Sequence, residues 1–66
     1  MDYVYLVYTE EGLQGCFRSE AGATQRVLEL AINQMDIDTA DTPLDFNSSW
    51  RWGWDICYYR KELVYA

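Results

Sequence analysis

The side chains of this chain best suited to chemistry are four aspartates in one segment, Asp36, Asp38, Asp41 and Asp45. Carboxylate oxygens are the ligands that calcium prefers in proteins, and Asp36-Ile37-Asp38 begins as an EF-hand calcium loop does. In that loop the fifth, sixth and twelfth positions carry an oxygen ligand, a glycine and a glutamate. Here those positions are Ala40, Asp41 and Asn47. We therefore expect no metal site and no cofactor, and interpret the segment as a solvated acidic loop.

The residue types give catalysis little support. The chain has no histidine, the side chain that most often acts as a general base near neutral pH. Its two cysteines, Cys16 and Cys57, fall in predicted strands without a paired base in sequence. We interpret both as free thiols, because disulfides are rare in chains that are not exported. The sequence therefore predicts no catalytic residue and no enzyme, since 66 residues also leave little room for a concave pocket.

The charge of the chain restricts its partners. Eleven acidic residues against five basic ones give a formal charge of −6, which argues against direct binding to nucleic acid. The expected partner is a protein with a basic or hydrophobic surface. No segment approaches the roughly 20 apolar residues of a membrane span, and Met1-Asp2-Tyr3 lacks the basic start of a signal peptide. These features predict a cytoplasmic protein that does not bind membranes.

Large apolar residues occupy every second position from Trp50 to Tyr58. This period is typical of a strand and places Trp50, Trp52, Trp54, Ile56 and Tyr58 on one sheet face. Arg51, Gly53, Asp55 and Cys57 then lie on the other face. We expect Trp54, Ile56 and Tyr58 to belong to the core, with Trp50 and Trp52 nearer its rim.

The remaining elements must position these side chains. Residues 3–18 predict a hairpin, because a run of β-branched and aromatic residues is followed by the turn Glu10-Glu11-Gly12 and a second short strand. Ser19 is a good N-cap for a helix over residues 20–35. An acidic loop over 36–49 and a C-terminal strand over 50–65 complete a single domain, residues 1–66. We predict an α+β fold of ββαβ order, with a mainly antiparallel sheet of three to four strands and one helix packed on one face.

Three surfaces are candidates for binding a partner. The first combines aromatic anchors, which would contact the partner, with acidic steering charges, which would attract it. The anchors are Tyr3, Tyr5, Trp50 and Trp52, and the steering charges are Asp36, Asp38, Asp41 and Asp45. The second is the sheet face opposite the tryptophans. It would expose Arg51, Asp55 and Tyr59 together with one face of the first strand, either Tyr3, Tyr5 and Val7 or Val4, Leu6 and Tyr8. The third is a free strand edge, through which the chain could form a homodimer.

The order of these segments resembles small acidic bacteriophage accessory proteins. The likeness rests on Tyr3-Val4-Tyr5-Leu6-Val7-Tyr8, the acidic turn with glycine, the segment Gly15 to Ser19 leading into a helix, and the tryptophan-rich final strand. It implies a domain that binds a host protein in the host cytoplasm and inhibits or redirects it. The alternatives are a self-associating structural subunit and, with less support, a nucleic-acid mimic or a small ligand-binding domain. The resemblance carries no functional residue over to this chain.

Overall fold

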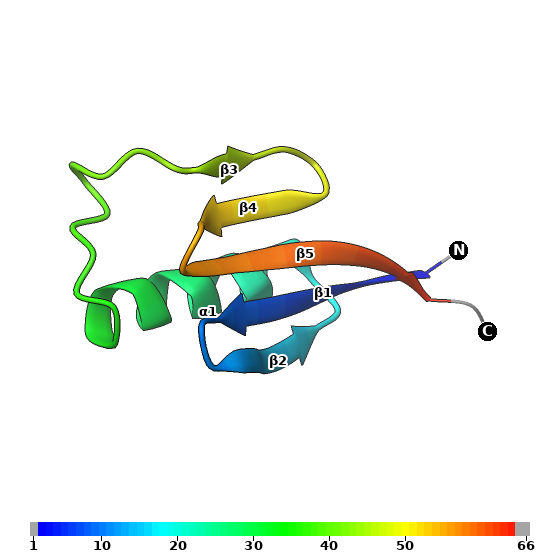
Figure 1. The fold of residues 1–66 in the computed structure, drawn as a ribbon. Coiled ribbons are helices and arrows are strands. Elements are labelled where there is room, and N and C mark those ends of the chain that lie inside the picture. The colour runs from blue at the N-terminus through cyan, green and yellow to red at the C-terminus, as the bar shows by residue number, and fades with distance from the viewer. Residues whose placement is uncertain (1, 65–66) are drawn as a thin grey trace.

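A computed structural model describes residues 2–64 of the chain and has one helix and five strands. The five strands form one antiparallel sheet of order β2-β1-β5-β4-β3. The helix packs across one face of this sheet (Figure 1). The predicted α+β class with a mainly antiparallel sheet and one helix is therefore confirmed. In chain order the elements are β1 (Asp2–Thr9), β2 (Gly12–Phe17), α1 (Glu20–Asn33), β3 (Phe46–Asn47), β4 (Arg51–Trp54) and β5 (Cys57–Val64).

The predicted ββαβ order with three to four strands is wrong, because the expected C-terminal strand is a hairpin. The chain turns at Asp55-Ile56, and Trp54 lies directly opposite Cys57. Residues opposite each other in neighbouring strands share a sheet face, so Cys57 lies on the tryptophan face and Tyr58 does not. β3 adds a further short strand inside the segment predicted as a loop. The last predicted strand position, Tyr65, lies outside the described residues.

The N-terminal hairpin forms where the sequence predicts it. β1 and β2 are joined by the turn at Glu10-Glu11, and Gly12 has a φ of 112°, which glycine adopts readily and other residues rarely do. The register shifts between Val7 and Tyr8, since Val7 lies opposite Gly15 whereas Tyr8 lies opposite Leu13. Gln14, the residue between Leu13 and Gly15 in β2, is therefore a bulge.

Local signals set the start of the helix more sharply than its end. The Ser19 hydroxyl accepts a hydrogen bond from the Gly22 N–H at 3.1 Å, which satisfies one of the free amides of the first turn. The helix ends at Asn33 rather than at residue 35, because the Gln34 and Met35 N–H groups both donate to the Leu30 carbonyl and close the last turn.

The core lies between α1 and the face of the sheet that contains Val7 and Tyr59. Tyr59 is only 2% exposed, and the rings of Tyr5 and Trp52 pack on either side of it at centroid distances of 5.5 and 5.7 Å. Aromatic pairs at these distances add to the stabilisation from burial alone. The buried cluster consists of Val7, Ala23, Val27, Leu30, Ala31, Trp54, Cys57 and Tyr59.

The segment after α1 closes one side of this core. Ile37 and Leu44 pack against the buried cluster, and the Ile37 N–H donates to the Ala31 carbonyl at 2.8 Å. The Trp54 indole N–H donates to the Thr42 carbonyl at 3.4 Å, which ties the segment to β4. The loop thus covers part of the apolar surface of α1, whereas Ile32 stays 51% exposed.

Candidate functional site

One face of the sheet has no covering element among residues 2–64. Val7 lies opposite Tyr59, and both are buried beneath α1, so their neighbours along each strand point to the other side. We call this other side the open face. Its side chains are Val4, Leu6, Tyr8, Leu13, Cys16, Phe46, Arg51, Tyr58, Arg60 and Glu62.

An arginine–aromatic cluster, Tyr8, Phe46, Arg51 and Tyr58, forms the centre of the open face. Tyr8 and Tyr58 stack at a centroid distance of 5.6 Å, and Phe46 meets Tyr58 edge to face at 5.9 Å. The Arg51 guanidinium lies 3.7 Å from the Phe46 centroid and 4.3 Å from that of Tyr58. Each such cation–π contact contributes about 0.5–1 kcal/mol when partly exposed.

Gly53 makes this cluster possible. It lies between Phe46 and Tyr58 in the sheet, directly opposite both. Because glycine has no side chain, the rings from β3 and β5 can lean over it and meet, and Arg51 then covers both. Gly53 has a φ of 130°, in the region that favours glycine. Local backbone geometry therefore builds a flat, partly aromatic surface here.

Arginines are concentrated on the open face. Arg51 and Arg60 lie directly opposite each other in β4 and β5, a placement in which like charges repel. Arg60 is balanced by Glu62, since their charged groups are 3.0 Å apart. Arg51 is held by the rings instead, and its Nε atom is buried without a hydrogen-bond partner in the described part of the chain.

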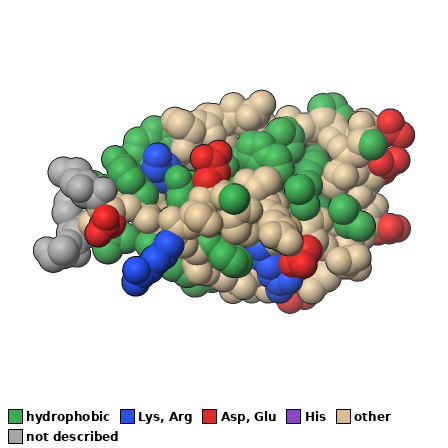
Figure 2. Space-filling model, turned by 180° about the vertical axis from the view of Figure 1, so that it is seen from behind, with side chains coloured by type: hydrophobic (Ala, Val, Ile, Leu, Met, Phe, Trp, Pro, Cys, Tyr) green, Lys and Arg blue, Asp and Glu red, His purple; other side chains and the backbone are tan. Residues whose placement is uncertain are grey.

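Most of the acidic residues gather at one end of the molecule, which we call the acidic pole. The chain folds into an elongated body of 39 × 21 × 17 Å, and the β1–β2 turn, the β4–β5 turn and the loop after α1 all lie at the same end (Figure 1). Figure 2 shows acidic side chains at this end from the helix side. The pole consists of Glu10, Glu11, Asp36, Asp38, Asp41, Asp45 and Asp55.

The four aspartates predicted as steering charges all lie in the acidic pole and are exposed. Two of them also accept hydrogen bonds from backbone N–H groups. The Asp45 carboxylate accepts from the Asp55 N–H at 2.8 Å, and that of Asp38 accepts from the Ala40 N–H at 3.1 Å. Within residues 2–64 no three acidic or cysteine side chains are grouped so that they could hold a metal ion.

The four predicted aromatic anchors separate into two pairs. Tyr5 and Trp52 pack beside Tyr59 against the buried cluster and lie on the α1 side of the sheet. Tyr3 and Trp50 lie on the same side but farther along it, with ring centroids 5.8 Å apart. Trp50 is 54% exposed, and the Lys61 ammonium lies 4.3 Å from the Tyr3 ring centroid. Of the four, Trp50 is the best placed to meet a partner.

The alternative surface opposite the tryptophans needs one correction. Tyr59 is buried under α1 rather than exposed with Arg51, because the turn at Asp55-Ile56 exchanges the faces of all later residues. Tyr58 takes its place on the open face. From β1 the open face takes Val4, Leu6 and Tyr8, one of the two sets that the sequence allowed. Phe46 and Leu13 were not predicted to lie on this surface. The only sequence signal for Phe46 is its position between turn residues.

Burial changes two ionisable groups of the core. It raises the pKa of the Tyr59 hydroxyl above its ordinary value of 10.0, and the nearby Glu20 carboxylate raises this pKa further. The Tyr59 hydroxyl donates a hydrogen bond to the Glu20 carboxylate at 3.2 Å. Burial likewise raises the pKa of the Cys57 thiol above 9.0, although Arg26 opposes the change. Both groups are therefore neutral at physiological pH and belong to the packed core.

We expect the two thiols to react at very different rates. Cys16 is exposed on the open face, whereas Cys57 is fully buried and donates to the Val27 carbonyl at 3.5 Å. Only thiolates attack disulfide reagents, so burial and the raised pKa both slow Cys57. At pH 8 an aromatic disulfide reagent should therefore modify one thiol per chain quickly and the second at least about 100-fold more slowly. Raising the pH toward 9 should accelerate the slow phase.

Two controls test this assignment. Cys16→Ser should remove the fast phase and leave the slow one, and denaturant should make both thiols react together. Equal rates in the native protein would contradict the burial of Cys57.

The fold has no helix that could cross a membrane within residues 2–64, since α1 is neither long nor apolar enough. Comparison with known proteins gives no match to a family model, a curated protein or a solved structure. The resemblance to phage accessory proteins therefore stays a prediction, and the function is inferred from the surface of the chain itself.

Proposed function

We propose that this chain is a small protein-interaction module that binds a partner protein through the open face, with the acidic pole beside it. The partner would present an apolar surface bordered by lysine or arginine. The arginine–aromatic cluster on an uncovered sheet face is the observation that carries this proposal. A cytoplasmic location and a role in inhibiting or redirecting a host protein belong to the same proposal and derive from the sequence alone.

The composition of the open face supports binding. An antiparallel sheet covered on one side normally alternates apolar and polar residues, so that its solvated face is polar. Here β1 contributes Val4, Leu6 and Tyr8 to the solvated face, and Leu13 beside them is 58% exposed. Large apolar patches on a small protein are typical of interaction sites. Tyrosine and arginine are also enriched among the residues that dominate binding energy.

The acidic pole supports a basic partner rather than an acidic one. Its residues lie in the turns and the loop at the ends of β1 and β4 and at the start of β5, close in the chain to Tyr8 and Tyr58. Charge placed beside an apolar contact surface speeds association with an oppositely charged partner and discriminates against other partners. At the same time, a molecule with a formal charge of −6 would be repelled from nucleic acid.

A matched pair of substitutions tests the proposal. Leu13 and Ile32 are both large, aliphatic and about half exposed, but Leu13 lies on the open face and Ile32 on α1. We expect Leu13→Asp to weaken partner binding at least 10-fold and Ile32→Asp to change it less than 2-fold, because only the first places a charge in the interface. The partner is isolated from nuclease-treated bacterial lysate, purified, and titrated with each variant by calorimetry.

Charge reversal in the acidic pole should act on the association rate. The double variant Glu11→Lys with Asp41→Lys should slow association roughly 3- to 10-fold at low salt and flatten its salt dependence. Glu29→Lys, on the exposed side of α1, is the control at a distance from the open face. Weakening by Ile32→Asp but not by Leu13→Asp would refute the open face as the binding surface. Recovery of only the chain itself would favour the self-associating subunit.

A further inference from the structure

β5 is longer than the strand that pairs with it on one side. β4 accompanies β5 only as far as Arg60, which lies opposite Arg51, and the Lys61 N–H then donates to the Trp50 carbonyl at 2.8 Å. Beyond this bond β5 continues to Val64, paired only with β1 on its other side. Among residues 2–64, no strand therefore covers the β4 side of Glu62–Val64.

The main chain of β5 can form hydrogen bonds on this side. Along a strand, successive residues direct their N–H and C=O groups alternately to the two neighbouring strands. Lys61 donates toward β4, so Leu63, two residues later, directs its N–H and C=O to the same side. An added strand could bond to both groups without disturbing the pairing of β5 with β1.

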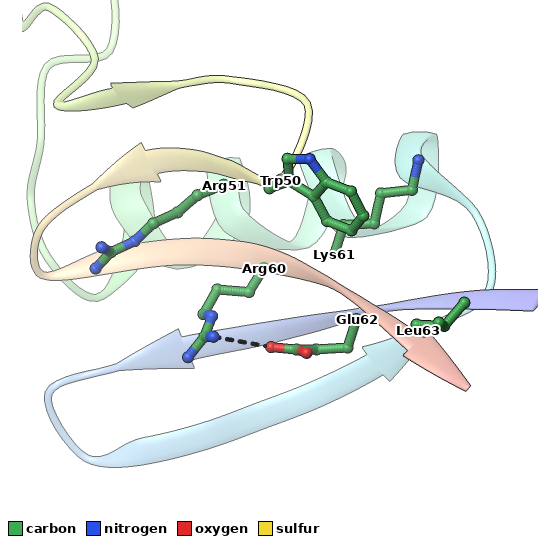
Figure 3. Close-up of a pocket in the computed structure, with 6 residues that line it drawn as sticks. All are labelled: Trp50, Arg51, Arg60, Lys61, Glu62 and Leu63. Atoms are coloured by element: carbon green, nitrogen blue, oxygen red, sulfur yellow. Dashed lines mark ion pairs between the residues drawn. The ribbon is translucent and has the colours of Figure 1, made fainter. Parts of the chain in front are cut away.

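A cavity of about 580 Å³ lies at this place. We call it the β5 notch; it is lined by Trp50, Arg51, Arg60, Lys61, Glu62 and Leu63. Figure 3 shows that Arg60 and Glu62 lie together, joined by their ion pair, and that the Trp50 ring and Lys61 lie side by side, apart from that pair. The notch thus has two walls, one on the open face and one on the α1 side of the sheet.

The charge of the notch is opposite to that of the whole molecule. Three of the five basic residues of the chain line it, against one carboxylate, that of Glu62. Glu62 and Arg60 compensate each other, which leaves Arg51 and Lys61 as the excess positive charge. The notch is therefore a local positive region on a protein with a formal charge of −6. Such a region attracts acidic rather than basic segments.

We propose that the β5 notch binds an extended peptide segment of alternating acidic and apolar residues, which adds to β5 as an antiparallel strand. Strand addition obtains affinity from main-chain hydrogen bonds and specificity from alternate side chains. The acidic residues would lie on the open-face wall and compete with Glu62 for Arg60, whereas the Arg51 guanidinium stays over Phe46 and Tyr58. The apolar residues would contact Trp50 and Leu63. The notch shares Arg51, Arg60 and Glu62 with the open face but takes a partner of opposite charge, and this proposal does not depend on the one made for the open face.

The other free edges are less suited to strand addition. β3 has only two residues, and β2 carries a bulge opposite Val7 and Tyr8, which interrupts a regular ladder. In the described part of the chain the β2 side of Asp2–Val4 in β1 is also unpaired, but the cavity there has one basic residue, Arg18, against one acidic residue, Asp2. Within residues 2–64, a free main chain, an exposed tryptophan and excess positive charge occur together only at the β5 notch.

Short peptides test the proposal directly on the full chain. The probes are blocked pentapeptides of sequence Glu-X-Glu-X-Glu, with valine, isoleucine, phenylalanine or tyrosine at both X positions, followed by amide NMR spectroscopy. We expect saturable shifts at Lys61–Val64 and at the Trp50 indole for at least one probe. Replacing the glutamates by lysines should weaken binding at least 10-fold. If no probe saturates these signals, the proposal is wrong.

N-methylated versions of the peptide show which of its residues form hydrogen bonds with β5. In an antiparallel ladder, two residues that bond to each other have their side chains on the same sheet face. The apolar peptide residues share the sheet face of Leu63, so they direct their amides to β5. Methylating the two apolar amides should therefore weaken binding at least 10-fold. Methylating two glutamate amides, which point to solvent, should change it less than 3-fold. Equal effects, or the reverse order, would overturn strand addition in this direction.

Substitutions in the chain separate the notch from the open face. Lys61→Glu should weaken peptide binding at least 5-fold, whereas Arg26→Glu on α1 makes the same change in net charge and should leave it within 2-fold. Leu13→Asp should not alter peptide binding, so failure of the open face and failure of the notch are distinguishable. Equal weakening by Lys61→Glu and Arg26→Glu would show that only net charge matters and would refute the site.

Discussion

Gly53→Ala is expected to unfold most of the protein at 25 °C. A Cβ atom at this position would lie 2.6 Å from the Cys57 carbonyl oxygen and 2.8 Å from the Tyr58 Cα atom. Both are backbone atoms of the neighbouring strand, so no side chain can rotate away to relieve the overlap. The positive φ of 130° adds a conformational cost of about 1–3 kcal/mol. We expect a total loss above about 3 kcal/mol, comparable to the whole stability of a domain of this size.

Gly12→Ala provides the matched control. Gly12 also has a positive φ, of 112°, but a Cβ there would meet no atom within 4 Å. The expected loss is therefore the conformational cost alone, about 1–2 kcal/mol, and the variant should stay folded. Urea unfolding followed by circular dichroism and tryptophan fluorescence measures both. Equal losses of stability for the two variants would contradict the close approach of the β4 and β5 main chains at Gly53.

Trp54→Ala should cost about 3–5 kcal/mol, the usual loss when a buried tryptophan is truncated. Trp54 is 3% exposed, packs edge to face on Trp52 at 5.9 Å, and donates its indole N–H to the Thr42 carbonyl. Its removal would leave a cavity under α1 and release the loop that closes the core. The variant should populate the unfolded state substantially and lose its cooperative urea transition.

Trp50→Ala, the same substitution four residues earlier, should cost less than about 1 kcal/mol, because this side chain is 54% exposed. Iodide should quench the fluorescence of Trp50 and leave that of Trp54 nearly unchanged. Comparable losses of stability for both variants, or strong quenching after Trp50 is removed, would contradict the placement of the tryptophans. A further use of Trp50→Ala is that it leaves a folded protein in which the β5 notch can be assayed.

Local signals in the sequence were sufficient for the first half of the fold. The β-branched run of β1, the glycine after Glu10-Glu11 and the N-cap at Ser19 act within a few residues of themselves, so their effect does not depend on distant contacts. The hairpin and the start of α1 follow from them. The placement of Trp54 in the core was also predictable, because a large apolar residue in mid-strand is normally covered. The end of α1 was less predictable, since it depends on how the chain turns toward β3.

The second half of the fold depended on tertiary structure. Large residues alternate from Trp50 to Tyr58, and this pattern fits both one straight strand and two strands joined by a two-residue turn. It cannot distinguish them, because it contains no information about the partner strand. Only the pairing of Trp54 with Cys57 reverses the faces of Tyr58 and Tyr59 and buries the latter. The five-stranded sheet and the corrected open face both result from that single turn.

The composition of the possible sites follows from the sequence alone: an acidic chain without histidine, rich in aromatic residues, with four of its six aspartates in one loop. Tertiary structure decided which of these residues meet. It brought two turns and the loop to one end as the acidic pole and placed Phe46 and Tyr58 over Gly53. Among residues 2–64 it left the β4 side of β5 uncovered beyond Lys61. These arrangements depend on strand order and strand length, which are set by long-range packing against α1 and therefore leave no local trace in the sequence.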